Sequence, residues 1–369
     1  MLDSRRLEDY IRLTSRYGDS SVMPENAIAV KVSNLQKLSG GVTNELFSFL
    51  LTFTAEGFEH KTDLVLKGYP EKAAAWFKTP RPDEDVRKYV REFQSMQSLS
   101  NIGFPVPQAY LCETDPFFLG YPFVIMSLEK VAQESVNRID CFASTLASLH
   151  NLKADEVGVR SLGFPSDGSA YAMEWPIRLR QLMSETKHYR SLRKDFDHAI
   201  SWLELNAADN DCPQYCLVHG EYHPGHTIIT RDDQMKVIDW EGVEIGDPAF
   251  DVGYAYHMVK LMCNIKNDDS GERTAEQFIS EYSRSFRGDV SGRLEFYKVV
   301  GILGVAIEVS SWISNPSIAY KRFGLKALPI ALAYPFRRLN FVAKKWLNSD
   351  FLASYLEYSQ DFIKTTLKR

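Results

Sequence analysis

A short stretch of this sequence combines carboxylate and imidazole side chains at close spacing. Glu221 comes two residues after His219, His226 follows five residues after Glu221, and Asp239 follows thirteen residues after His226. Two carboxylates and an imidazole around one small volume suit a divalent metal ion and a phosphate group. We therefore interpret these residues as a candidate site for metal-assisted phosphate chemistry.

The neighbouring residues predict how these side chains are positioned. Residues 227–229 and 235–238 are two short apolar segments, which we interpret as strands joined by a turn. The His-rich loop stands before the first strand, and Asp239 ends the second. This arrangement brings the loop and the end of the second strand to the same place.

A zinc hydrolase is the alternative that the histidines themselves suggest. His219, His223 and His226 are spaced i, i+4 and i+7 and would converge on one metal ion only from a helix. Pro224-Gly225 opposes a helix here. We therefore disfavour the zinc hydrolase.

Periodicity along the rest of the chain predicts an α+β protein with two lobes. Apolar alternation indicates strands, and apolar residues three or four apart indicate helices. Residues 1–127 are expected to form an antiparallel β lobe with one helix, and residues 128–369 a mainly helical lobe. Expected strands cover 27–32, 46–53, 63–69, 109–113 and 121–127; helical spacing covers 3–18, 83–100, 137–152, 170–185, 193–206, 247–265, 274–287, 291–313 and 350–367.

The loop resembles the catalytic loop of the aminoglycoside phosphotransferase/choline kinase-like family, whose two-lobed fold is similar to that of protein kinases. The family pattern is H-G-D-x-x-x-x-N, and this chain has Glu221 in place of the Asp. His226 replaces the Asn, as in macrolide and 2″-aminoglycoside phosphotransferases. The resemblance implies that Glu221 is the catalytic base, that His219 braces the catalytic loop, and that His226 and Asp239 bind Mg²⁺.

The same resemblance implies an ATP or GTP site between the lobes. Lys67 resembles the strand lysine that contacts the α- and β-phosphates, and Glu92 resembles the helix acid that pairs with it. Residues 39–44 resemble the glycine-containing loop over the phosphates, and the segment that ends at Leu128 resembles the hinge that seats the purine. The implied cofactor-binding residues are Gly40, Gly41, Thr43, Asn44, Lys67, Glu92, Met126 and Leu128.

Composition narrows the class of protein. A net charge of −5 disfavours a nucleic-acid partner held by bulk charge. The longest apolar run, between Lys298 and Glu308, is too short for a bilayer, and the charged N-terminus lacks the apolar region of a signal peptide. We expect a cytoplasmic protein without a membrane partner, whose oligomeric state the sequence leaves open.

The acceptor of the phosphate remains open. Residues 291–349 hold only two acids, Glu295 and Glu308, whereas a polycationic aminoglycoside calls for a dense carboxylate lining. We expect a neutral, apolar or anionic small molecule with a hydroxyl group, such as a sugar or a macrolide-like polyol. A nucleotide-binding protein with weak or no transfer is the alternative, because Glu221 replaces the usual Asp.

Overall fold

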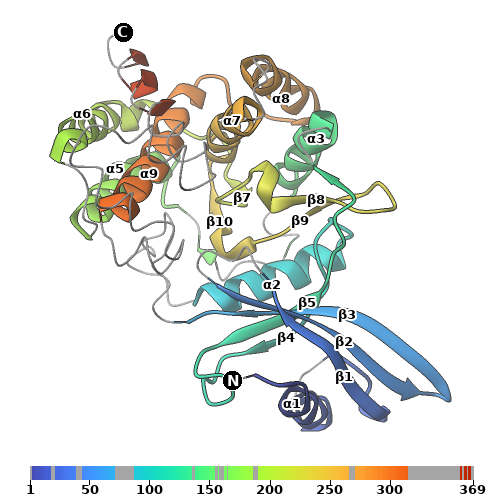
Figure 1. Ribbon diagram of the computed structural model, residues 1–369. Helices are drawn as coiled ribbons and strands as arrows, with labels where there is room; N and C mark the ends of the chain where they lie inside the picture. The colour runs from blue at the N-terminus through green and yellow to red at the C-terminus, as the bar shows by residue number, and fades with distance from the viewer. Residues whose placement is uncertain are drawn as a thin grey trace.

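The computed structural model describes most of the chain and shows two lobes, one β-rich and one mainly helical (Figure 1). The two-lobed α+β prediction is confirmed. The described residues are 2–17, 21–38, 44–70, 87–134, 138–153, 157, 162–163, 165–185, 190–265, 271–314, 358–359, 361–363 and 365–366.

A five-stranded antiparallel sheet in the order β1-β2-β3-β5-β4 forms the first lobe. In β2, alternating side chains are buried, as expected for a strand with one face on a core. Glu56 and Gly57, the two residues between β2 and β3, both have positive φ, which is the turn that matches the twist of a two-residue hairpin. The strands are β1 (Ile28–Lys37), β2 (Glu45–Ala55), β3 (Phe58–Gly68), β4 (Ala109–Glu113) and β5 (Phe123–Ser127).

Two helices cover the two faces of this sheet, and they correspond to the helical spacing predicted over 3–18 and 83–100. On the outer face lies α1 (Ser4–Tyr17), which buries Leu7 and Ile11 against the strands. α2 (Lys88–Asn101) lies on the face toward the helical lobe, as Figure 1 shows. Its buried residues share one apolar core with the helical lobe, so α2 links the two lobes.

The second lobe surrounds two small sheets with helices. β6 pairs with β8 and β8 with β9, while β7 pairs with β10. Its strands are β6 (Gln133–Glu134), β7 (Cys216–Val218), β8 (Thr227–Ile229), β9 (Met235–Val237) and β10 (Glu244–Gly246). Its helices are α3 (Ile139–His150), α5 (Ala170–Glu185), α6 (Arg190–Asn206), α7 (Pro248–Ile265), α8 (Gly271–Ser285) and α9 (Leu294–Ser314), with short 3₁₀ turns η3 (Ala207–Asp209), η4 (Pro224–His226) and η5 (Trp240–Gly242).

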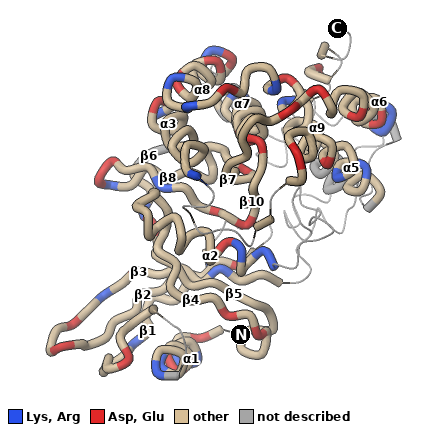
Figure 2. Tube along the Cα trace, turned by 180° about the vertical axis from the view of Figure 1, so that it is seen from behind, with Lys and Arg blue, Asp and Glu red and all other residues tan. Residues whose placement is uncertain are grey.

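The lobes also meet through the backbone and through charged side chains. Val237 of β9 donates its N–H to the carbonyl of Pro105, 2.9 Å away, in the loop after α2. Figure 2 shows basic and acidic residues interspersed over both lobes and meeting near α2. Among the helices in the described part of the chain, none combines the length and apolarity that crossing a bilayer requires.

Candidate active site

Lys67, near the end of β3, joins three separate parts of the chain. Its Nζ lies 2.8 Å from both carboxylate oxygens of Glu92 on α2 and 2.6 Å from Oδ1 of Asp239. Burial opposes the lysine charge, but the carboxylates of Asp239 and Glu92 outweigh it and raise the Lys67 pKa above its ordinary value. The ammonium is therefore charged and fixed at the junction of the lobes.

Glu92 has further partners that hold this junction together. Its carboxylate accepts hydrogen bonds from the Tyr69 hydroxyl and, at 3.2 Å, from the backbone N–H of Trp240. Trp240 is fully buried and packs edge-on against Phe104, with ring centroids 5.9 Å apart. The residue after Asp239 is thus locked to α2, which fixes the position of the aspartate.

α7 anchors the loop between β7 and β8 through one side chain. The carboxylate of Asp251 accepts the backbone N–H groups of His219 at 2.6 Å and of Gly220 at 2.9 Å. Gly220 has a φ of +86°, and an added Cβ would come within 2.2 Å of the Gly242 carbonyl oxygen. Only glycine fits where the loop passes this close to η5.

His219 serves the loop rather than the reacting groups. Its Nε2 lies 2.9 Å from the carbonyl oxygen of Ile238, and its Nδ1 accepts the N–H of Glu221 at 3.2 Å. Burial lowers the His219 pKa to about 4, so the ring is neutral at ordinary pH. The geometry supports the bracing role that the resemblance implied.

Three predicted residues converge on one small volume. One ligand atom from each of Glu221, His226 and Asp239 lies within 4.8 Å of the other two. The Nδ1 of His226 lies 3.0 Å from the Glu221 carbonyl, which can only accept, so Nδ1 carries the proton. The Nε2 of the same ring lies 3.2 Å from Oδ2 of Asp239. Asp239 itself has left-handed backbone angles, with φ 65° and ψ 60°.

The side-chain nitrogen and oxygen atoms of His226 and Asp239 fit a divalent cation as ligands. Adjacent ligands of an octahedral ion with bonds of about 2.1 Å are about 3.0 Å apart, and the His226–Asp239 separation of 3.2 Å is close to that value. The Glu221 carboxylate is buried and lies beside the same volume. A cation there would be held by Asp239 and the His226 imidazole, with the Glu221 carboxylate beside it.

The three histidines of the zinc alternative do not converge. Both ring nitrogens of His219 are bonded to backbone groups, of Ile238 and Glu221, and among the described residues no candidate metal cluster contains more than one histidine. The ring centroid of His223 lies 3.9 Å from that of His226. Its Nδ1 accepts the N–H of Gly225 at 3.0 Å, so His223 shapes the turn beside the site.

The remaining predicted nucleotide contacts are only partly described. Gly40, Gly41 and Thr43 lie outside the described residues. Asn44 is buried at the start of β2, where its amide donates to Glu241 at 3.0 Å.

The predicted hinge lies at the end of β5. Met126 pairs with Val65 of β3 inside the sheet, and the Leu128 N–H donates to the Asp63 carbonyl at 3.0 Å. The sheet therefore uses the Leu128 N–H that was expected to bind a purine. In this arrangement the base would have to take its donor from another residue at this edge.

Two residues at the junction were missed from the sequence. Glu241 is buried two residues after Asp239, and its carboxylate lies 3.4 Å from the ammonium of Lys88 on α2. The Asp-Trp-Glu sequence was visible, but nothing local indicated that Glu241 would turn toward the other lobe. Lys88 looked like an ordinary exposed helix residue.

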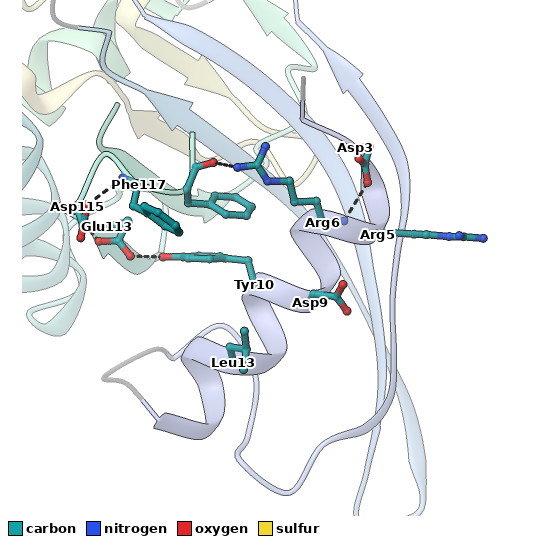
Figure 3. Close-up of a pocket in the computed structure, with 10 residues that line it drawn as sticks. Asp3, Arg5, Arg6, Asp9, Tyr10, Leu13, Glu113, Asp115 and Phe117 are labelled. Atoms are coloured by element: carbon teal, nitrogen blue, oxygen red, sulfur yellow. Dashed lines mark hydrogen bonds between the residues drawn. The ribbon is translucent and has the colours of Figure 1, made fainter. Parts of the chain in front are cut away.

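A separate pocket lies on the outer side of the sheet, away from this chemistry. Figure 3 shows it between α1 and the loop that follows β4, with Phe117 exposed at its mouth and Tyr10 pointing to Glu113. Its volume is about 640 Å³. Neither the candidate metal ligands nor Lys67 line it.

Comparison with known proteins agrees with this geometry. Residues 50–294 match the phosphotransferase enzyme family APH. Among solved structures, a Ralstonia eutropha protein described as a candidate aminoglycoside phosphotransferase has a TM-score of 0.61, with 15% identity and coverage of 100% of this chain and 98% of that one. APH(4)-Ia in a ternary complex with ADP and hygromycin B has a TM-score of 0.55, with 13% identity and 98% coverage of both chains. These likenesses establish the fold.

Curated relatives are longer proteins. Acyl-CoA dehydrogenase family member 11 of Pongo abelii is 28% identical over 247 residues, which are 58% of this chain and 30% of the relative. Acyl-CoA dehydrogenase family member 10 of Mus musculus is 27% identical over 186 residues, 45% of this chain and 16% of the relative. The chain thus spans less than a third of either protein. The match over residues 50–294, which include Lys67, the catalytic loop and Asp239, shows that the chain belongs to the phosphotransferase enzyme family.

Proposed function

We propose that this protein is a kinase that moves the γ-phosphoryl group of ATP or GTP to a hydroxyl group of a small molecule. Family membership supports phosphoryl transfer. The similar fold of APH(4)-Ia, which has been solved with ADP and with AMP-PNP, supports a nucleotide as the donor.

The observation that carries the proposal is the contact of Lys67 with both Glu92 and Asp239. An ammonium held between a helix acid and a metal-binding aspartate can neutralise phosphate oxygens without first being ordered. The three residues come from β3, α2 and the end of β9, so chance proximity within one element does not explain their meeting. Their order along the chain matches the resemblance stated above.

Asp239 and His226 are the proposed metal ligands, with Glu221 beside them. A bound divalent cation would neutralise charge on the transferring phosphoryl group and orient it. Mg²⁺ prefers oxygen ligands, whereas an imidazole ligand makes Mn²⁺ more competitive. We infer that both ions support the reaction.

Glu221 is the proposed base. Its carboxylate would accept the proton of the acceptor hydroxyl as the oxygen bonds to phosphorus and the bridge to the nucleoside diphosphate breaks. Glutamate is one methylene longer than the aspartate of the family pattern, so its carboxylate reaches further from the backbone, and it lies beside the proposed metal ligands. Burial of the carboxylate keeps it near the reacting atoms and away from bulk water.

For the acceptor we propose a neutral or anionic molecule that carries a hydroxyl group. The scarcity of acids in residues 291–349 disfavours a polycation. The names of the curated relatives make a hydroxylated acyl-CoA thioester one candidate, since it is both anionic and apolar. A sugar or a macrolide-like polyol is the other class to test.

The experiment combines binding with transfer. We expect metal-dependent binding of labelled ADP, and phosphate transfer from ATP or GTP to a member of a panel of hydroxyacyl-CoA thioesters, sugars and macrolides. Asp239→Asn should remove the metal-dependent part of the binding, whereas Asp233→Asn, an exposed turn residue, should leave it intact. Equal ADP binding by Asp239→Asn and the parent protein would overturn the kinase assignment. Binding without transfer to any acceptor would favour the non-catalytic alternative.

A further inference from the structure

Donors from three elements converge on one carboxylate oxygen of Glu241. The Asn44 amide lies 3.0 Å from Oε2, the Lys88 ammonium 3.4 Å and the Lys67 ammonium 4.0 Å. Arg91 of α2 adds a contact of 3.3 Å to the Glu241 backbone carbonyl. The Glu241 side chain is only 6% exposed, so bulk water does little to screen these contacts.

Two of these donors, Asn44 and Lys67, are ones that a nucleotide would use if the proposed function is right, and the inference rests on that function. Asn44 lies at the end of the predicted phosphate-covering loop, and Lys67 is the predicted phosphate-contacting lysine. Glu241 contacts the Asn44 amide and the Lys88 ammonium in the way that a phosphate oxygen would. A phosphate group approaching alone must displace this carboxylate and approach its negative charge.

A metal ion changes this balance. One carboxylate oxygen from each of Glu92, Asp239 and Glu241 lies within 4.8 Å of the other two, so three negative charges surround Lys67. Within 4.8 Å in a buried site, the Glu241 carboxylate would strongly attract a divalent cation bound to Asp239. The same carboxylate would repel a phosphate group that carries no metal ion. The charge thus favours the metal–nucleotide complex over the free nucleotide.

We propose that Glu241 is a positioning residue that makes nucleotide binding conditional on the divalent metal. It holds Asn44 and Lys88 away from a metal-free phosphate and adds its charge to the metal site. The structure assigns this role to the carboxylate charge and not to the bulk of the side chain. Glu241→Asp, which keeps the charge, should therefore retain most of the effect.

The test measures the dissociation constant of ADP by equilibrium dialysis, once with EDTA and once with Mg²⁺. The quantity compared between variants is the EDTA value divided by the Mg²⁺ value. For Glu241→Gln we expect this ratio to fall about tenfold relative to the parent protein, because metal-free ADP binds more tightly when the charge is gone. The matched control is Glu204→Gln, which removes the same charge from a surface pair with Arg180 and should leave the ratio unchanged.

A second variant has the opposite expected sign. Lys88→Met removes the cation that faces Glu241, so metal-free ADP should bind more weakly and the ratio should rise severalfold. Circular dichroism spectra and melting temperatures report whether both variants are folded. A shared loss of structure would change both dissociation constants in the same direction in both variants and so differs from the expected pattern.

The outcomes separate this inference from the proposed function. If the parent protein binds ADP neither with Mg²⁺ nor with EDTA, the proposed function fails. If the parent shows metal-dependent binding but folded Glu241→Gln keeps the parental ratio, only the role of Glu241 is overturned. A ratio that falls in Glu204→Gln as much as in Glu241→Gln would also overturn it, since total charge would then explain the effect.

Discussion

At Lys67 a single ammonium pairs with the buried carboxylate of Glu92 and with the partly exposed carboxylate of Asp239. The Lys67 side chain is 7% exposed and that of Glu92 is 1% exposed. Removing one partner of such a pair leaves a buried charge uncompensated and costs on the order of 3–5 kcal/mol. The residue therefore contributes to the stability of the lobe junction in addition to its proposed role in phosphate binding.

We predict that Lys67→Met lowers the free energy of unfolding by about 3 kcal/mol and weakens ADP binding at least tenfold. Chemical denaturation measures the first effect and equilibrium dialysis the second. Lys130→Met is the matched control, because its pair with Asp63 is exposed and should contribute less than about 1 kcal/mol. Equal stability losses in the two variants would contradict the structural role of Lys67.

At Glu221 we predict a separation of binding from turnover. Glu221→Gln keeps the size of the side chain but removes its basicity, so kcat should fall on the order of 10²–10⁴-fold while the dissociation constant of ADP stays within a few-fold. Wild-type turnover in this variant would remove the proton-acceptor role. Glu221→Asp tests whether the length of this side chain matters. It moves the carboxylate by about 1 Å, and such a displacement can change kcat about a hundredfold in either direction.

The residues of the site were more predictable than their partners. Motif order alone identified Lys67, Glu92, His226 and Asp239, which the structure brings together. Glu241 was missed because burial of a charged side chain depends on donors that arrive from another lobe. No local pattern in the sequence carries that information.

At the scale of elements, the catalytic loop depends on α7. Asp251 accepts two backbone N–H groups of the loop and also lies 3.2 Å from Nε2 of His150, whose Nδ1 lies 2.8 Å from the Tyr282 hydroxyl. α3, α7 and α8 are thus tied to one loop through a single carboxylate. The geometry of the loop is set by the packing of the helical lobe.

We predict that Asp251→Asn displaces this loop, because the asparagine amide group would face a backbone N–H where a carboxylate oxygen was. The free energy of unfolding should fall by about 1–3 kcal/mol, and kcat should fall on the order of a hundredfold, with little change in ADP affinity. Asp289→Asn, at an exposed turn where Asp289 accepts the Ser291 N–H, is the control and should preserve kcat. An unchanged kcat in Asp251→Asn would show that the loop is held by other contacts.

Long elements were predicted well, whereas among the strands of two or three residues the prediction covered β8 and β9 beside the motif. The helical spacing over 3–18, 170–185 and 247–265 corresponds to α1, α5 and α7, because long helices repeat their apolar spacing over several turns. β6 and β10 were not predicted, since strands of two and three residues carry no periodicity. The predicted helix over 350–367 lies mostly outside the described residues.

At the scale of the whole molecule, buried neutral histidines make stability depend on pH. Burial lowers the pKa of His219 to about 4 and that of His257 to about 3. Both pKa values lie below the value of about 6.5 for an unfolded chain, so the unfolded state takes up protons first as the pH falls. Stability is then greatest above pH 6.5 and is lost as the pH falls from there toward 4 and 3.

We predict that each of these histidines contributes a slope of about 1.4 kcal/mol per pH unit between pH 6 and 4. His257 bonds to the Tyr358 hydroxyl and the Lys298 carbonyl, so His257→Gln keeps polar atoms but no longer titrates. Urea unfolding at several pH values gives the free energy of unfolding as a function of pH. Its slope between pH 6 and 4 should be smaller in this variant by about 1.4 kcal/mol per pH unit, which corresponds to one proton. A slope equal to that of the parent protein would contradict the burial of a neutral ring at position 257.

The left-handed backbone at Asp239 has a consequence for how such a protein can change over time. Asparagine and aspartate are among the few side chains that adopt these angles readily, so replacement of Asp239 by asparagine is compatible with the local backbone. A single substitution could therefore abolish cation binding while the architecture persists. Loss of catalysis and loss of the fold would then be separate evolutionary events, and a descendant without chemistry could still present the same two-lobed surface to its surroundings.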